Sequence, residues 1–336
     1  MSSASLDPSR GARVVARRAL LYSRGPAPAL DRPPHVRAGS SLVALGDGRL
    51  AVIQDDACFL AVVDPASGAA VDVPFPGDGP RQFDDTRGNK KQKLDLEAAF
   101  MTEDAALLVA LGSGSSPLRE RVVFVENPRG SAPRVTIAAA HELYAQLRAD
   151  RSFSGSELNI EGAVVVGDDL LLFQRGNGAP SITGGTSIAP VDATARIALA
   201  PLLAHLRDGR ALPPHREVIA WDLGTVAGHR LTFTDGAVHT RTGRSTVAFL
   251  ACAEDSPDAT RDGPVSAVMI GCLDEAQGRA ELGAILDEHG APLLDKAEGL
   301  AFDPADPSHA FVVTDRDDPA APSELLSIRL GEGWTR

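Results

Sequence analysis

The stretch that decides the fold is LNIEGAVVVGDDLLLFQRGNG, residues 158–178. It places two apolar runs on either side of a Gly-Asp-Asp turn, which is the pattern of a β-hairpin. The carboxylate of Glu161 stands at the start of the first run, where a strand enters a core and an unpaired charge is costly. Glu161 therefore either lies in solvent at the strand end or has a partner.

The same arrangement recurs along the chain. Each copy has a polar or acidic residue, a small residue, a strand, a tight turn and a second strand, followed by a polar loop and further strand-like segments. The distance between copies leaves room for four strands and long loops in each. The polar residues at the shared position are Ser40 or Ser41, Glu97, Glu161, Asp235 and Glu298.

These repeats predict an all-β fold, a five-bladed β-propeller that forms a single domain over residues 1–336. The fifth copy lacks a fourth strand, and the N-terminal segment has the strand character needed to complete it. Six blades are the alternative, if the longest gap hides a degenerate unit. Helices are expected only in insertions at 140–150 and 199–209. The approximate blades are 37–80, 93–138, 157–220, 231–285, and 296–331 with 13–24.

Composition limits the partners. With 43% hydrophobic residues the chain can bury a large core, and its net charge of −12 argues against nucleic acid and anionic membranes as partners. Three scattered cysteines form no Cys-x-x-Cys pair, which is typical of buried thiols in a reducing compartment. The N-terminus lacks the apolar core of a secretory signal, so we expect a cytoplasmic location. A small or cationic ligand remains compatible with this composition, whereas a small anionic substrate or ligand is expected from the arginine-bearing loops described below. The oligomeric state stays open.

In a propeller the first strand of each blade lines the central channel, so the shared polar positions should form a ring at one mouth of it. Four carboxylates so close together raise one another's pKa and cannot all stay ionised without help. An all-oxygen ring suits Ca²⁺, which takes about 6 to 8 oxygens. We therefore predict Ca²⁺ at the ring, with Lys296 offsetting the excess charge. The alternative is that these acids only mark strand starts and meet channel water. The predicted ligands are Ser40, Ser41, Glu97, Glu161, Asp235 and Glu298.

The first-strand segments KLDLEAAF, LNIEGAVV, LTFTDGAV and DKAEGLAF resemble those of the soluble calcium-activated nucleotidases, the apyrases. That resemblance implies a five-bladed propeller with Ca²⁺ at its centre. It covers only the repeat cores, and Glu-Gly at a strand start also occurs in phytase-like esterase propellers. Asp235 stands where the nucleotidases have serine. Overall the chain is most similar to uncharacterised bacterial propeller proteins, a resemblance that implies a fold but no activity.

Loops that join second to third strands should lie on the same face as the ring, and here they are rich in polar residues. Arginine beside Ca²⁺ suits a phosphoryl or carboxylate substrate, because both stabilise oxyanion charge. We expect Arg175 and Arg316 to act as anion clamps and Asp315 or Glu254 to act as a base. The alternative is that these loops are polar because they are wet.

Two functions follow from the sequence. The first is a calcium-dependent hydrolase of phosphate esters or anhydrides, or a phytase-like esterase. The second is a noncatalytic propeller in which a structural ion fastens the blades and a rim binds a small molecule or a protein.

Overall fold

Residues 158–178 form the expected hairpin in a computed structural model that describes residues 2–255 and 263–335. Its strands, β12 (Ile160–Val166) and β13 (Asp169–Gln174), pair antiparallel. β13 is apolar along most of its length because both of its faces are buried. Leu170 and Leu172 pack into one hydrophobic cluster, whereas Leu171 and Phe173 pack into another on the opposite face. Each such side chain stabilises the fold by about 1.5–3 kcal/mol when it is fully buried.

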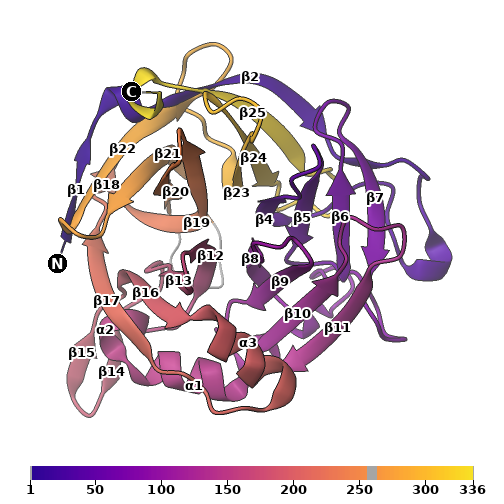
Figure 1. The fold of residues 1–336 in the computed structure, drawn as a ribbon, viewed down its shortest axis with the longest axis horizontal. Helices are drawn as coiled ribbons and strands as arrows, with labels where there is room; N and C mark the ends of the chain where they lie inside the picture. The colour runs from indigo at the N-terminus through magenta and orange to yellow at the C-terminus, as the bar shows by residue number, and fades with distance from the viewer. Residues whose placement is uncertain (1, 256–262, 336) are drawn as a thin grey trace.

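Within the described residues, strand pairing forms five antiparallel sets of four strands, which we call blades 1 to 5. The first strands of neighbouring blades contact one another around a closed ring. Figure 1 shows the blades arranged about a central axis, and the prediction of an all-β propeller is confirmed. The strands of blades 1 and 2 are β4 (Gly39–Ala44), β5 (Leu50–Gln54), β6 (Phe59–Val63), β7 (Ala69–Pro74), β8 (Leu96–Met101), β9 (Leu107–Gly112), β10 (Arg121–Glu126) and β11 (Arg134–Ala139).

The remaining blades carry most of the insertions. The helices are α1 (His141–Ala149), α2 (Arg151–Ser154) and α3 (Leu199–Asp208), so α1 and α3 lie where the sequence predicted them. No helix of the described residues is long and apolar enough to cross a membrane. Short hairpin strands are β14 (Ser181–Thr183), β15 (Thr186–Ile188) and β18 (Thr225–Val226). Blade 3 continues with β16 (Asp192–Ala198) and β17 (His215–Asp222); blade 4 has β19 (His229–Arg241), β20 (Arg244–Glu254), β21 (Val265–Asp274) and β22 (Arg279–Leu286); blade 5 has β23 (Lys296–Phe302), β24 (His309–Asp315) and β25 (Glu324–Leu330).

The core lies between the blades. Among the described residues, each of five hydrophobic clusters fills the space between two neighbouring blades, including the space between blade 5 and blade 1. Because successive residues of a strand point to opposite faces, every blade contributes to two clusters. This packing explains why many middle strands are continuous apolar runs rather than alternating ones.

The N-terminal segment contacts four blades. β2 (Ala12–Ala19) pairs antiparallel with β25 and supplies the fourth strand of blade 5. β1 (Ser2–Leu6) runs parallel to both β17 and β22 and so connects blades 3 and 4. β3 (Leu21–Tyr22) leaves blade 5 and pairs with β7 of blade 1. The segment 13–24 is therefore divided between two blades.

A β-bulge interrupts the first strand of every blade at the same place. The register shifts between Gly39 and Ser41, Leu96 and Ala98, Ile160 and Gly162, Phe233 and Asp235, and Ala297 and Gly299. A small residue follows the bulge residue in every blade except blade 4, where Asp235 stands, and the first strands approach closely there. A Cβ on Gly162 would lie 2.8 Å from the backbone N of Gly236, and one on Gly299 would lie 2.7 Å from that of Leu42. The bulge leaves one residue per blade unpaired in the ladder and re-aims its side chain.

The residues inside these bulges are Ser40, Glu97, Glu161, Thr234 and Glu298. The structure therefore puts Thr234, not Asp235, at the fourth ring position. Asp235 is buried, and its carboxylate accepts hydrogen bonds of 2.8 Å from the backbone N–H groups of Gly236 and Leu300. It connects β19 to β23.

Deleting residues 2–19 should leave the backbone edge of β25 exposed, because β2 is removed with β1. We expect a lower melting temperature and aggregation through the open edge. Deleting only residues 2–6 should lower the melting temperature by a smaller amount, because blade 5 keeps its fourth strand. Size-exclusion chromatography and thermal melting check this. A 2–19 deletion as soluble and as stable as the full chain would show that β2 is not needed to close the ring.

Replacing Asp235 by alanine should lower the free energy of unfolding by about 2–5 kcal/mol, because two buried N–H groups lose their acceptor. The free energy of unfolding of Asp235→Asn should lie between those of the alanine variant and wild type, because the amide keeps one acceptor oxygen. Chemical denaturation with and without calcium measures both, and we expect the loss to be the same in each condition. A variant of wild-type stability that had lost a response to calcium would restore Asp235 as a ring ligand.

Candidate cation site in the central channel

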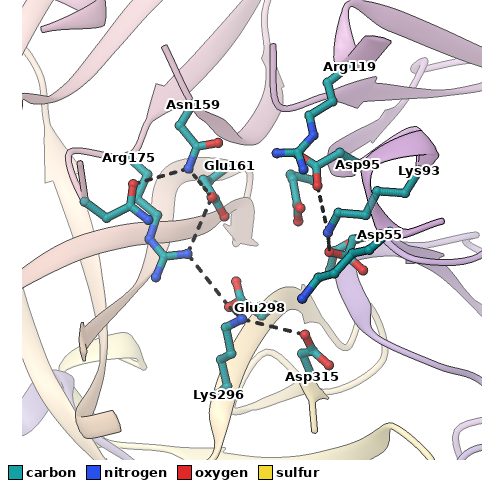
Figure 2. Close-up of a pocket in the computed structure, with 14 residues that line it drawn as sticks. Asp55, Lys93, Asp95, Arg119, Asn159, Glu161, Arg175, Lys296, Glu298 and Asp315 are labelled. Carbon is teal, nitrogen blue, oxygen red and sulfur yellow. Dashed lines mark hydrogen bonds and ion pairs between the residues drawn. The ribbon is translucent and has the colours of Figure 1, made fainter. Parts of the chain in front are cut away.

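A cavity of about 80 Å³ opens at the channel mouth, where four of the five bulge residues line it and Thr234 does not (Figure 2). This volume has room for a few water molecules or for an ion with part of its hydration shell. Six carboxylates and five cationic side chains line it, so its charges are nearly balanced. The lining residues are Ser40, Asp55, Lys90, Lys93, Asp95, Glu97, Arg119, Asn159, Glu161, Arg175, Asn177, Lys296, Glu298 and Asp315.

Three of the five bulge residues are glutamates, and they are paired to different degrees. Glu161 accepts a hydrogen bond of 2.7 Å from the side-chain amide of Asn159 and one of 3.4 Å from Arg175 Nη1. Neither carboxylate oxygen of Glu298 has a hydrogen-bond partner, although both are buried. Glu298 Oε1 lies 3.7 Å from Lys296 Nζ and 3.9 Å from Arg175 Nη1, which is ion-pair distance only.

The other two bulge residues carry hydroxyl groups. Ser40 Oγ donates a hydrogen bond of 2.6 Å to the carbonyl of Leu96, and Thr234 Oγ1 donates one of 2.8 Å to the carbonyl of Ala297. Each hydroxyl thus fastens its strand to the next blade, at the residue before that blade's glutamate. Of the six predicted ligands, Ser40, Glu97, Glu161 and Glu298 line the cavity, whereas Ser41 and Asp235 do not.

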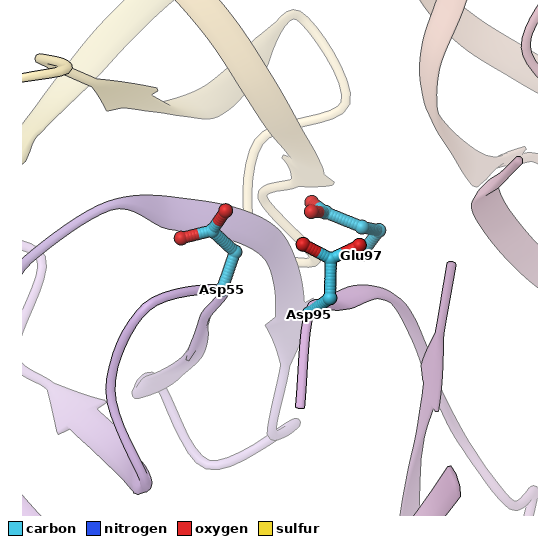
Figure 3. Close-up of side chains that lie close together, drawn as sticks. All are labelled: Asp55, Asp95 and Glu97. Atoms are coloured by element: carbon cyan, nitrogen blue, oxygen red, sulfur yellow. The ribbon is translucent and has the colours of Figure 1, made fainter. Parts of the chain in front are cut away.

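A second acidic group adjoins the ring. One carboxylate oxygen from each of Asp55, Asp95 and Glu97 lies within 4.8 Å of the others (Figure 3). Lys93 pairs with two of these acids: its Nζ contacts Asp55 and lies 2.8 Å from Asp95. Arg119 Nη1 lies 3.0 Å from the other oxygen of Asp95. The chain's own cations therefore already occupy this side of the cavity.

Burial and mutual repulsion set the pKa values of the ring glutamates. Burial raises the pKa of Glu161 to about 7, against the opposing charges of Arg175 and Lys296. Burial also raises the pKa of Glu298 well above its usual value. For Glu97, burial and the charges of Asp55 and Asp95 raise the pKa well above the usual value. Without another cation, the ring therefore retains protons near neutral pH.

Only part of the predicted catalytic group lies at the cavity. Arg175 lines it, but its guanidinium donates to Thr232 and Glu254 as well as to Glu161, which leaves little capacity for a substrate anion. Glu254 is itself buried against Arg175. Arg316 is outside the cavity lining and pairs with Glu324 at 3.0 Å. Asp315 lines the cavity, 3.6 Å from Lys296.

Sequence reasoning did not assign Lys93, Asp95 or Asn159 to the site, although a signal for two of them was present. Asp95, Asn159 and Lys296 each stand two residues before a bulge glutamate. Side chains two residues apart on a strand share a face, so these were candidates for the same cavity. Nothing in the repeat pattern marks Lys93, which reaches the site from the loop before β8.

Distant structural likenesses are found among solved proteins. A glutaminyl cyclase from Myxococcus xanthus is 12% identical over 96% of this chain and 97% of that chain, with a TM-score of 0.46. A PQQ-bound aldose sugar dehydrogenase from Streptomyces coelicolor is 11% identical over 95% and 97%, with a TM-score of 0.40. The WD40 β-propeller domain of Doa1 is 9% identical over 97% and 99%, with a TM-score of 0.38. At such scores these likenesses carry no argument about function.

Sequence comparison identifies the protein family to which the chain belongs. No curated protein sequence matches this chain significantly. The resemblance to the apyrases stays an expectation from the first-strand motifs. One family model, however, matches residues 35–330, which include the first strands of all the blades and every bulge residue. The chain therefore belongs to the family of unknown function DUF6929.

Proposed function

We propose that the central channel binds a divalent cation, with Ca²⁺ the best match, through Glu97, Glu161 and Glu298. The observation that carries this proposal is the state of Glu298, whose two buried carboxylate oxygens have no hydrogen-bond donor. A buried carboxylate without donors is costly unless it is protonated or bound to a cation. A cation held by three blades would supply that missing charge.

The donor chemistry fits this choice. The residues that line the cavity offer carboxylate, hydroxyl and amide oxygens, and none of them is a histidine or a cysteine. Hard oxygen ligands favour Ca²⁺ or Mg²⁺ over Zn²⁺. The hydroxyl of Ser40, which lines the cavity, already donates to a carbonyl group but keeps an oxygen lone pair for a water or an ion. When bound, the cation would fasten the blades at the channel mouth.

The geometry favours a binding protein over a hydrolase. Anion clamps need guanidinium groups with donors to spare, and Arg175 spends its donors on protein acceptors while Arg316 lies elsewhere. Asp315 lines the cavity but faces a lysine rather than an open substrate pocket. A calcium-binding propeller without hydrolytic chemistry is therefore the function we propose, and a phosphatase and esterase substrate panel gives the direct comparison.

Replacing Glu298 by glutamine should weaken calcium binding about tenfold or more, because the amide loses the charge that Ca²⁺ favours. Without calcium the variant should melt at a higher temperature than wild type, because glutamine removes the cost of burying a carboxylate, whether that cost is paid as a buried charge or as the uptake of a proton. Isothermal titration calorimetry and thermal melting after EDTA treatment measure both effects. Glu142→Gln, at a carboxylate whose side chain is 78% exposed, is the matched control. A wild-type protein indifferent to EDTA and to added calcium would refute the proposal.

Calcium binding should also depend on pH. Glu161, with a pKa of about 7, must lose its proton before it binds a cation, so affinity should rise between about pH 6 and about pH 8. The stability of the cation-free protein should depend on pH in the opposite direction. The folded state holds this proton above the usual pKa of 4.5, so the free energy of unfolding should fall as pH rises from about 4.5 to about 7.

Calorimetry in two buffers of different ionisation enthalpy gives the number of protons released on binding. Thermal melting of the calcium-free protein over the same pH range gives the stability trend. An affinity that does not change with pH, together with no proton release, would show that Glu161 is not a ligand.

A further inference from the structure

Lys296 is a cavity cation on the same strand as a ring glutamate. It stands at the start of β23, two residues before Glu298, and both side chains line the cavity (Figure 2). Lys296 Nζ lies 3.7 Å from Glu298 Oε1, 3.6 Å from Asp315 Oδ2 and 3.3 Å from Asp317 Oδ1. Its side chain is only 11% exposed. The ammonium thus lies between the ring and a pair of acids farther out.

The two cations nearest Glu298 differ in how they are held. The guanidinium of Arg175 is held in place by the hydrogen bonds that it donates, one of 2.7 Å to Glu254 and one of 3.2 Å to Thr232. Lys296 ends in a compact ammonium on a flexible four-carbon stem, and one of its carboxylate neighbours, Asp317, is half exposed. Lys296 Nζ already donates a hydrogen bond of 3.3 Å to Asp317 Oδ1, so this partner would be kept if the ammonium moved away from Glu298.

We propose that Lys296 is the internal counter-cation of Glu298, which competes with a divalent cation for this carboxylate and withdraws towards Asp315 and Asp317 when the cation binds. The inference rests on the proposed function and adds a property to it: the bound cation is exchangeable. Because Lys296 is again beside Glu298 when the metal leaves, the folded protein tolerates the loss of the metal.

The physical reason is charge repulsion at short range. A divalent ion bound to Glu298 would share that carboxylate with an ammonium now 3.7 Å away. Two positive charges at such distances repel strongly in a poorly solvated cavity. Moving Lys296 towards Asp315 and Asp317 relieves the repulsion, but it costs the ion pair with Glu298. Both effects weaken calcium binding relative to a ring without this lysine.

The test is the affinity of the full chain for calcium chloride, measured by isothermal titration calorimetry after EDTA treatment and desalting. Lys296→Met should lower the dissociation constant about tenfold or more, because the competing charge is gone. Lys296→Arg keeps the charge, so its dissociation constant for calcium should stay near that of wild type. If Lys296→Met does not fold, Lys296→Gln serves in its place. Without calcium, Lys296→Met should melt below wild type, and saturating calcium should reverse that order.

Lys90→Met is the matched control for charge alone. Lys90 lines the same cavity, but its side chain is 47% exposed and its Nζ lies 3.6 Å from Asp85. Removing this solvated charge should change the dissociation constant by less than about threefold, because exposed charges are screened. An equal gain in both methionine variants would show that only the total charge of the cavity matters, and would overturn the role of Lys296.

The remaining outcomes separate this inference from the proposed function. If wild type binds calcium and Lys296→Met binds no more tightly, the inference fails and the proposed function stands. If only Lys296→Met binds, the lysine is the resident cation, and calcium binding by the native chain is refuted. If neither binds, both fail.

Discussion

The structure depends on the close approach of five first strands around one axis. At the channel mouth their backbones come so near that a Cβ on Gly162 or Gly299 would overlap the neighbouring strand. Each strand also carries a β-bulge at the same position. Because the bulge residue leaves the regular ladder, its side chain is re-aimed at the channel, and that is how Glu97, Glu161 and Glu298 come to share one cavity.

Bringing these glutamates together creates a charge problem that the chain solves only in part. Arg175, Lys93 and Arg119 neutralise the surrounding acids through short contacts. Glu298 receives only the longer ion pairs, and Glu97 lies among other carboxylates. The described acids are therefore unevenly paired, because Asp95 and Glu254 have short contacts to cations whereas Glu298 has none. This uneven pairing is the physical basis for the proposed binding site.

The features of the fold and the site that could be predicted are those encoded by local sequence patterns. Apolar runs, turns and repeats along the chain predicted the propeller, the N-terminal strand of the last blade and the helical insertions. They also predicted that Glu97, Glu161 and Glu298 would be equivalent. The sequence failed at the fourth position, where Thr234 and Asp235 are neighbours and a shift of one residue moves a side chain to the opposite face. Pattern matching favoured the acid, whereas the bulge selects the threonine.

The sequence by itself determined the all-β fold, the repeat and the residue types that face the channel, because these depend on periodicity and turn chemistry within each repeat. The tertiary structure decided which side chains pair. Arg175 is engaged by Glu254, Asp235 by the backbone of Leu300, and Lys296 by acids on both sides. The partners of Arg175 and Asp235 lie on neighbouring blades and meet only when the ring closes, so no local pattern encodes them. The partners of Lys296 lie within blade 5, on β23 and at the end of β24. The same closure sets how much charge each carboxylate in the channel can keep.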